Sequence, residues 1–273
     1  MKKIISIFIL VNVFLVNLPA QHSVAVNKGI HNSEDQHDFI KNGEFITIHG
    51  LNGLESSVYA AGPEDAAAGI LIVHDFFGIT PATKESVERL GAMGYRTIAV
   101  DLYSGKFASS NDSAQILMQA KDRKKTDILL NDAIRYLKHP GRKLATIGFS
   151  AGGIDAVYAN LMDPEAFSAT VVIYAGDYDK IEKSKIENLK SPILAITGSL
   201  DKWAVESAFH FFADHKDKSF ELYIYPGADH GFAQPFFLNG KNYDAEATRM
   251  TWKLTEDFLF RHLQNEPSYK GAH

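Results

Sequence analysis

The sequence predicts a single α/β domain, with a mostly parallel central sheet and helices on both of its faces. Short apolar runs alternate with helix-like segments along most of the 273 residues, and this alternation is typical of parallel sheets that are covered on both sides. Hydrophobic residues make up 45% of the chain, which is enough to bury one large core. No internal repeat interrupts the pattern, so we expect one domain over residues 44–264.

The first twenty residues predict a secretory signal peptide. MKKIISIFILVNVFLVNLPA places two lysines before an apolar stretch and ends on Pro19-Ala20, as signal peptides do ahead of their cleavage site. Two asparagines interrupt the stretch, which is shorter than the ~20 residues of a stable membrane span. We expect cleavage after Ala20 and export to the periplasm or the extracellular space, with no stable membrane span afterwards. An uncleaved membrane anchor is the alternative.

Seven apolar runs predict the strands of the sheet. They lie between polar segments at 21–43 and 265–273, which lack a sustained period and are expected to be flexible. The predicted strands are 45–49, 70–74, 96–100, 144–149, 170–174, 193–197 and 220–225.

Three apolar stripes predict helices that cover the sheet. Thr80-Pro81 is typical of a helix start, and Val87, Leu90 and Met93 are expected to face inward until Gly94 ends the helix. A second stripe, at i, i+3, i+4 and i+7, predicts a helix that ends before residue 140; it consists of Leu130, Ala133, Ile134 and Leu137. The last helix is predicted over about 244–263, with a buried edge of Met250, Leu254 and Phe258.

Charge and cysteine content exclude several function classes. The formal charge of −5 becomes −7 after signal cleavage, because the first twenty residues hold two lysines and no acidic residue. A mildly acidic chain without a Lys/Arg run is unsuited to nucleic acids. Cysteine is absent, which rules out a disulfide, a thiolate nucleophile and a cysteine metal site. A small molecule is therefore the expected partner, and the sequence does not predict the oligomeric state.

Residues 147–153, IGFSAGG, place Ser150 between glycines at the end of a predicted strand, and Ala151 opens a predicted helix that reaches about residue 161. Gly-x-Ser-x-Gly alone is a weak signal, but strand, sharp turn and helix are the setting of a nucleophile elbow. Gly148 and Gly152 remove side chains that would collide where strand and helix approach closely. The Ser150 hydroxyl would then project beside a helix N-terminus, which favours negative charge. The alternative is a glycine-rich turn with a passive serine.

A serine hydroxyl is a poor nucleophile at neutral pH unless a base takes its proton, so a histidine and an orienting carboxylate are required. Asp201 follows a predicted strand in ITGSLDKW, and His230 lies after the last predicted strand in IYPGADHGF. The chain order Ser150, Asp201, His230 is that of α/β-hydrolases.

Other residues compete for the two partner roles. Asp177 and Asp179 follow the strand predicted at 170–174 and are alternative acids. Asp229 adjoins the histidine, but a sequence neighbour rarely has the geometry to orient it. His74, directly after an early strand, is the main competitor for the base.

Five segments add to this pattern in a fixed order: HDFFG at 74–78, DLY at 101–103, GFSAGG at 148–153, GSLD at 198–201 and GADHGF at 227–232. Over residues 45–263 the chain thereby resembles the dienelactone hydrolase family of α/β-hydrolases, whose marks are H-E-x-F-G, D-L-Y, G-F-C-x-G-G, G-x-x-D and G-x-H-G-F. The resemblance implies an oxyanion hole formed by the backbone N–H groups of Phe76 and Ala151. It also implies a structural role for His74.

The chain departs from the family pattern at three places. Ser150 stands where the best-known members have cysteine, and Asp75 stands where they have glutamate. Ser104-Gly105-Lys106 replaces an arginine that holds the substrate carboxylate in the dienelactone enzymes, so dienelactone itself is not the expected substrate.

The substrate pocket is predicted only in outline. Side chains near the catalytic segments are candidates to line it; they are Asp75, Phe77, Tyr103, Trp203, Phe232, Phe236 and Phe237. Lys106 and Arg123 could meet an anionic group, although solvated charge is the simpler interpretation.

The sequence therefore predicts an exported serine hydrolase that cleaves a carboxylic ester or lactone without a metal or organic cofactor. Ser150 attacks, His230 moves the proton and Asp201 orients His230. Two alternatives stay open: a secreted peptidase or polyester-type esterase that uses the same three residues, and a non-catalytic α/β-hydrolase-fold binding protein.

Overall fold

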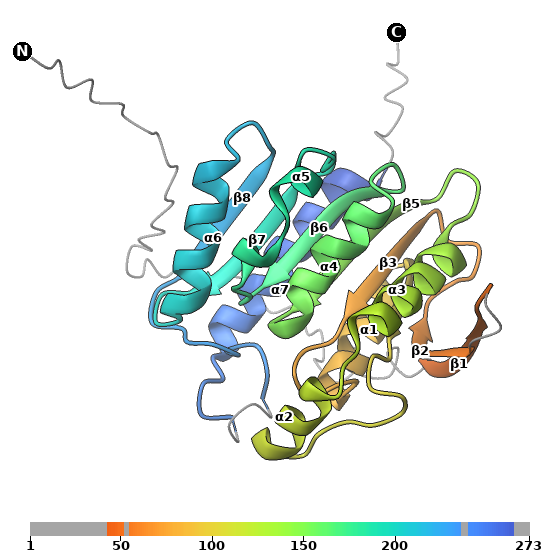
Figure 1. Ribbon diagram of the computed structural model, residues 1–273, viewed down its shortest axis with the longest axis horizontal. Helices are drawn as coiled ribbons and strands as arrows, with labels where there is room; N and C mark the ends of the chain where they lie inside the picture. Colours follow the sequence, from red (N-terminus) through yellow and green to blue (C-terminus); the bar gives the residue numbers. More distant parts are fainter. Residues whose placement is uncertain (1–42, 52–54, 236–239, 265–273) are drawn as a thin grey trace, which may run out of the picture. The chain divides into compact units, whose positions relative to one another are not determined.

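The computed structural model describes residues 43–51, 55–235 and 240–264. The predicted signal peptide, all but the last residue of the segment 21–43, and the tail 265–273 lie outside these ranges. The described residues form an eight-stranded sheet in the order β1-β2-β4-β3-β5-β6-β7-β8 (Figure 1). The strands are β1 (Glu44–His49), β2 (Glu55–Ala61), β3 (Ala68–Val73), β4 (Arg96–Val100), β5 (Lys143–Phe149), β6 (Phe167–Ile173), β7 (Ile193–Gly198) and β8 (Phe220–Tyr225).

The sheet is mostly parallel, as predicted. Strands β3 to β8 run parallel to one another, whereas β2 pairs antiparallel with both β1 and β4. The β2 segment, ESSVYAA, is absent from the predicted strands, because serines and alanines make up four of its seven residues and have weak strand preference. Antiparallel pairing on both sides holds it in the sheet nonetheless.

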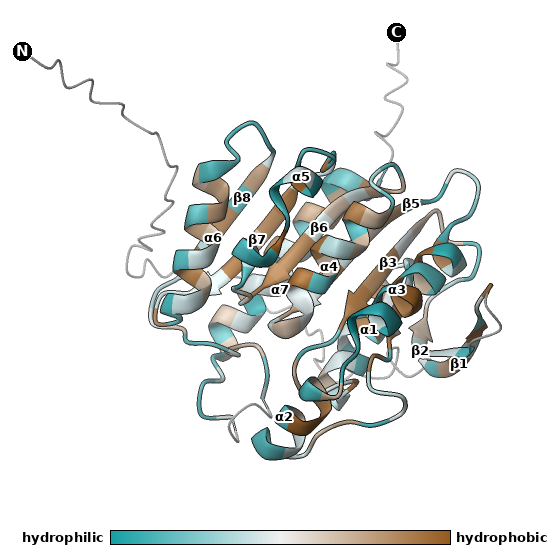
Figure 2. Ribbon diagram, viewed as in Figure 1, coloured by the Kyte–Doolittle hydropathy of each residue, from teal (hydrophilic) through white to brown (hydrophobic). Residues whose placement is uncertain are grey.

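Helices cover both faces of the sheet, and alternate residues of each strand point to opposite faces. One core cluster joins Ile70 and Ile72 of β3 to α1 (Pro81–Ala92) and α7 (Ala245–Leu263). Leu71 and Val73 point to the other face, which is covered by α3 (Arg123–Leu137), α4 (Ala151–Met162) and α6 (Lys202–Asp214). In Figure 2 the strands are mostly brown, which marks hydrophobic residues, and the helices carry many teal, hydrophilic residues. Two short helices, α2 (Asn111–Gln119) and α5 (Lys183–Ile186), complete the set.

The predicted helices are present, but the buried faces of α1 and α7 differ from the predicted ones. Thr80 caps α1 as predicted, whereas Met93 is 45% exposed because it is the C-cap residue, where the helix no longer faces the sheet. In α7 Phe258 is fully buried, but Met250 and Leu254 are only partly buried. The α7 face that packs on the sheet is shifted by one position and includes Thr251 and Thr255. Within the described ranges, no helix combines the length and apolar character needed to cross a bilayer.

Candidate active site

Ser150 lies in the sharp turn between β5 and α4, at the carboxyl edge of the sheet. Its backbone is strained, with φ 49° and ψ −118°, a region that side-chain-bearing residues rarely adopt. The turn is fixed because the Ser150 N–H donates to Ile173 O at 2.9 Å. A Cβ on Gly148 would collide with the backbone of Gly152, and one on Gly152 would collide with His74 O. The two glycines therefore allow α4 to begin against β5 and against the loop after β3.

Asp201 lies at the end of β7, where it is buried and caps the N-terminus of α6. Its Oδ1 accepts a hydrogen bond from the Ala204 N–H at 3.1 Å, so the carboxylate is held by the helix that it starts. Its Oδ2 lies 2.7 Å from Nδ1 of His230. One carboxylate thus joins the end of β7 to the loop after β8, the neighbouring strand.

His230 bridges Asp201 and Ser150. Its Nε2 lies 2.8 Å from Ser150 Oγ, and Asn242 donates to its backbone oxygen at 2.8 Å. Since the carboxylate of Asp201 is an acceptor only, the Nδ1 facing it carries the proton, and the Nε2 lone pair faces the serine hydroxyl. The imidazole also packs edge-on against Tyr174, with ring centroids 5.5 Å apart. The structure thus brings the three predicted residues into one continuous arrangement.

The competing acids are engaged elsewhere. Asp177 accepts from the Trp203 indole N–H at 3.2 Å and pairs with Lys180, and Asp179 is exposed. Asp229 Oδ1 accepts from the backbone N–H of His230 at 2.7 Å, which helps to position the loop. The sequence predicts Asp201 as the acid and leaves Asp177 and Asp179 as alternatives, because the distances of these carboxylates from His230 depend on how the loops pack.

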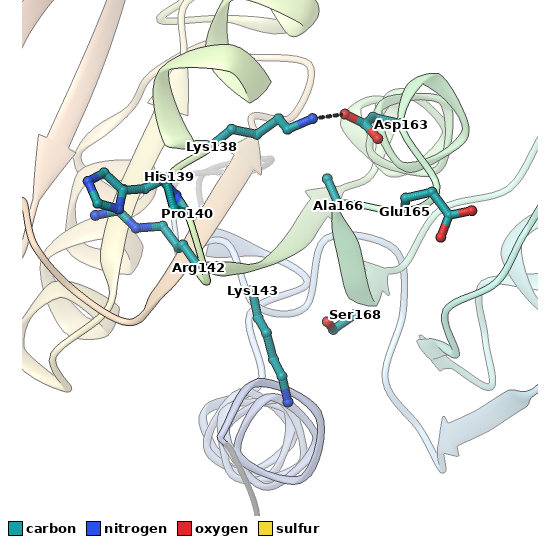
Figure 3. A pocket seen from close by; sticks show the side chains of 9 residues that line it. All are labelled: Lys138, His139, Pro140, Arg142, Lys143, Asp163, Glu165, Ala166 and Ser168. Carbon is teal, nitrogen blue, oxygen red and sulfur yellow. Dashed lines mark hydrogen bonds and ion pairs between the residues drawn. The ribbon is translucent and has the colours of Figure 1, made fainter.

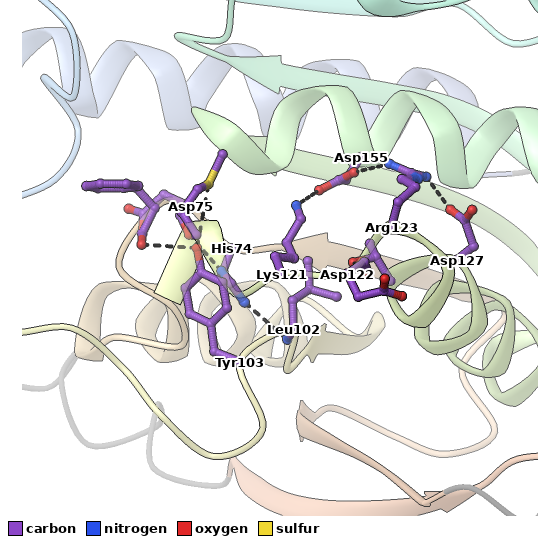
Figure 4. A network of polar contacts seen from close by, with 12 residues as sticks. His74, Asp75, Leu102, Tyr103, Lys121, Asp122, Arg123, Asp127 and Asp155 are labelled. Atoms are coloured by element: carbon purple, nitrogen blue, oxygen red, sulfur yellow. Dashed lines mark hydrogen bonds and ion pairs between the residues drawn. The ribbon is translucent and has the colours of Figure 1, made fainter. Parts of the chain in front are cut away.

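His74 is a buried residue of the loop between β3 and α1, and its imidazole contacts backbone groups. Its Nδ1 lies 2.7 Å from Asp75 O, and its Nε2 accepts from the Leu102 N–H at 3.2 Å (Figure 4). Because the Leu102 N–H donates to Nε2, Nε2 carries no proton and the ring is neutral; burial, which lowers the pKa of His74, favours the same form. These contacts give His74 a structural place, separate from Ser150.

Asp75 is a buried carboxyl group of the same loop. Its Oδ1 accepts from the Phe77 N–H at 2.8 Å. Burial raises the pKa of Asp75 to about 6, while the Phe77 hydrogen bond and the nearby His230 favour its charged form. An acidic group with this pKa changes charge between about pH 5 and about pH 7.

The two amides expected to form the oxyanion hole lie on neighbouring segments. Ala151 is the first residue of α4, and Phe76 belongs to the loop that Gly152 touches. Among the described residues, neither N–H donates to a protein acceptor. Both donors are therefore free to bind an external oxygen.

The predicted pocket residues differ in whether their side chains can reach a bound substrate. Trp203 is 46% exposed and lies with its ring centroid 5.6 Å from that of His230, so it can contact a substrate. Phe232, in contrast, is fully buried beneath Tyr174 in the core, so its predicted place in the pocket is wrong. Phe236 and Phe237 lie outside the described residues.

Phe77 and Tyr103 support the loop after β3. Phe77 is buried in a small cluster with Ala108 and Ala114. The Tyr103 hydroxyl donates to Phe76 O at 3.2 Å, and its ring packs on His74. Their side chains therefore brace the backbone that carries the Phe76 N–H.

The two cationic candidates do not form an anion site beside Ser150. Arg123 pairs with Asp127 and, at 2.6 Å, with Asp155, a buried residue of α4 that also binds Lys121 at 2.5 Å (Figure 4). Lys106 is exposed. The Arg123 charge is thus used to hold α3 against α4.

Other polar groupings lie away from this edge. Figure 3 shows a hollow at the opposite, amino edge of β5 and β6, where Lys138 pairs with Asp163 at 2.6 Å. Within residues 43–51, 55–235 and 240–264, no three His, Asp or Glu side chains gather as a metal site would require.

Comparisons with known proteins identify the family of this chain. A model of the dienelactone hydrolase family matches residues 57–263. The chain is 27% identical to the protein usf of Aquifex pyrophilus over 228 residues, which cover 78% of this chain and 96% of that protein. It is 26% identical to a putative carboxymethylenebutenolidase of Aquifex aeolicus over 230 residues, with the same two coverages.

Solved structures show the same fold. A putative dienelactone hydrolase from Klebsiella pneumoniae superimposes with a TM-score of 0.66 at 19% identity, over 81% of this chain and 99% of that chain. A likeness at this identity establishes the arrangement of strands and helices, which is that of an α/β-hydrolase.

Proposed function

Because the chain belongs to the dienelactone hydrolase family and is a carboxylic ester hydrolase, we propose that it cleaves an ester or lactone through an acyl-enzyme on Ser150. One observation carries the proposal. Ser150 Oγ lies 2.8 Å from His230 Nε2, and His230 Nδ1 lies 2.7 Å from Asp201 Oδ2. This is the geometry in which a base can activate a serine hydroxyl.

Acylation begins when Ser150 Oγ attacks the substrate carbonyl and His230 Nε2 takes the hydroxyl proton. The resulting imidazolium is stabilised by the Asp201 carboxylate, which stays charged. His230 then returns the proton to the leaving alkoxide as the carbonyl–oxygen bond breaks. In a lactone, the leaving hydroxyl remains tethered to the acyl group.

Two backbone donors stabilise the charge that develops on the carbonyl oxygen. The Ala151 N–H lies at the N-terminus of α4, where the helix dipole favours negative charge, and the Phe76 N–H approaches from the loop after β3. Each such donor lowers the barrier by ~3 kcal/mol.

Deacylation repeats these steps with water. His230 takes a proton from a water molecule, the hydroxide attacks the ester carbonyl on Ser150, and the proton passes to Ser150 Oγ as the carboxylic acid leaves. All of these steps use protein groups and water.

The polar groups at the site favour a substrate without a carboxylate near the reacting bond. Arg123 is held by Asp155 and Asp127, Lys106 is exposed, and the buried acidic residue Asp75 interacts electrostatically with His230. A second carboxylate would meet like charge there.

We further propose that the enzyme acts after export. The support is the sequence of residues 1–20, with two lysines, an apolar stretch and Pro-Ala at the end. Expression of the full chain in a bacterium, fractionation and N-terminal sequencing test this. Mature protein beginning at Gln21 outside the cytoplasm supports export, and an intact N-terminus in the cytoplasm contradicts it.

Covalent labelling tests the acyl-enzyme directly. A fluorophosphonate should modify Ser150, located by mass spectrometry, and Ser150→Ala should lose both labelling and hydrolysis of p-nitrophenyl acetate. Ser168→Ala, on β6 at the opposite edge of the sheet, serves as the matched serine control and should keep both. Modification at another residue, or undiminished activity in Ser150→Ala, would exclude this mechanism.

A further inference from the structure

His74 is buried, neutral and outside the proposed proton transfer, yet both of its ring nitrogens are engaged. The Leu102 N–H donates to Nε2 at 3.2 Å, which means that Nε2 carries no proton. In a neutral imidazole the proton must then be on Nδ1. The Nδ1–H donates to the carbonyl oxygen of Asp75 at 2.7 Å.

The Asp75 oxygen belongs to the peptide that links Asp75 to Phe76. No cis peptide occurs among the described residues, and in a trans peptide the C=O and N–H groups point in opposite directions. Fixing the Asp75 oxygen on the His74 ring therefore turns the Phe76 N–H away from His74. That N–H is one of the two proposed oxyanion donors.

We propose that His74 is a positioning residue that orients the Phe76 N–H toward the substrate oxygen. This inference rests on the proposed function, because it needs the Phe76 amide to act in the reaction. His74 acts indirectly. The Leu102 N–H, just after β4, fixes the orientation of the His74 ring through a hydrogen bond to Nε2. The ring in turn fixes the Asp75–Phe76 peptide through the hydrogen bond from Nδ1 to the Asp75 oxygen.

The neighbouring peptide is fixed by other groups, so the role of His74 is separable. The Phe76 oxygen accepts from the Tyr103 hydroxyl at 3.2 Å, and the Phe77 N–H donates to Asp75 Oδ1 at 2.8 Å. For the Asp75 oxygen, the Gly78 N–H is the other donor, at the longer distance of 3.3 Å. Loss of the His74 donor would therefore loosen the Asp75–Phe76 peptide and leave the rest of the loop braced.

Two variants separate positioning from mere filling of space. In His74→Asn the amide nitrogen occupies the place of Nδ1 and can still donate to Asp75 O, whereas Leu102 loses its acceptor. In His74→Gln the amide oxygen occupies the place of Nε2 and can still accept from Leu102, whereas Asp75 O loses its donor. Positioning predicts that the Asn variant keeps kcat within a few-fold of wild type.

For His74→Gln we expect kcat to fall about 10- to 100-fold, below the 10²–10³ that loss of a whole oxyanion donor costs, because Gly78 still holds the peptide. KM should change little, since the charged oxygen exists only in the transition state. Affinity for a boronic acid, which places a charged oxygen in the hole, should fall in parallel with kcat.

The control is His262→Gln on α7, whose helix ends near the start of β5 and far from Ser150; it should keep wild-type kinetics. Thermal unfolding of each variant sets an assay temperature at which all are folded. Wild-type kcat in His74→Gln, or equal losses in the Asn and Gln variants, would overturn the inference.

A measurement on the unmodified protein covers the case in which a variant does not fold. Nitrogen-15 NMR of the wild-type ring should show Nδ1 protonated and Nε2 bare, and the opposite tautomer would refute the positioning role of His74. Fluorophosphonate labelling of wild type at Ser150 is scored separately. If that labelling fails, the proposed function fails, whatever the His74 variants show.

Discussion

Replacement of Asp75 by asparagine should make the protein more stable, and increasingly so as the pH rises. Asp75 is buried in the loop after β3, and burial raises its pKa from 3.8 to about 6. Asparagine has nearly the same shape and can still accept the Phe77 hydrogen bond, but it never becomes charged.

The size of this stability change follows from the shift in the pKa of Asp75. A rise of about 2 pKa units corresponds to about 3 kcal/mol, at 1.36 kcal/mol per unit. Because the folded carboxyl binds its proton more tightly than the unfolded one, the native wild type loses stability as the pH rises from about 4 to about 6. Below about pH 4 the carboxyl is protonated in both states, so the cost disappears. The amide NH₂ adds a constant penalty of about 1–3 kcal/mol if it finds no acceptor.

The assay is urea unfolding of wild type and Asp75→Asn at several pH values between about 4 and about 7.5. The difference in unfolding free energy should shift by about 2–3 kcal/mol in favour of the variant across this range, whatever the constant offset. Titrating groups that do not interact with Asp75 are common to both proteins and cancel. A difference that stays flat with pH, or that favours the wild type as the pH rises, would refute the reasoning.

Three further substitutions test the site and its supports. Gly152→Ala should abolish esterase activity, because its Cβ would collide with His74 O; wild-type kcat with an intact circular dichroism spectrum would contradict this. Asp201→Asn should lower kcat about 10⁴-fold by favouring the wrong tautomer of His230, and a loss below tenfold in steady-state assays would argue for another acid. Asp155→Ala should destabilise the fold by about 3 kcal/mol, because it removes the carboxylate that pairs with the Lys121 ammonium, whose side chain is only 16% exposed; a change in urea midpoint worth less than about 1 kcal/mol would show that the pair contributes little.

Local patterns were sufficient for much of the fold. The strands β1 and β3 to β8 were predicted within a few residues. For β3 to β7 the reason is that apolar runs buried on both faces are distinctive in sequence. The start of α1 was also predicted, because Thr80-Pro81 is a local capping signal. β2 was missed because its stability in the sheet comes from pairing on both sides, and not from its own residues.

The same distinction between local sequence signals and tertiary packing applies to the candidate site. The glycines around Ser150 and the order of Asp201 and His230 are visible in the sequence, since they reflect local backbone limits and chain order. The sequence also favours Asp201 over Asp177, but the distance of 2.7 Å between Asp201 Oδ2 and His230 Nδ1 is set by the tertiary structure. Phe232 shows the opposite error: it is close to His230 in sequence, yet its side chain points into the core.

The sequence by itself determined the alternation of strands and helices, the strained serine turn and the family resemblance, because each depends on residues close together in the chain. Only the tertiary structure decided which nitrogen of His74 carries its proton, how strongly Asp75 is desolvated and which carboxylate reaches His230. These properties arise where β3, β4, β7 and β8 end at one edge of the sheet, and distances across that edge are set by packing of segments far apart in sequence.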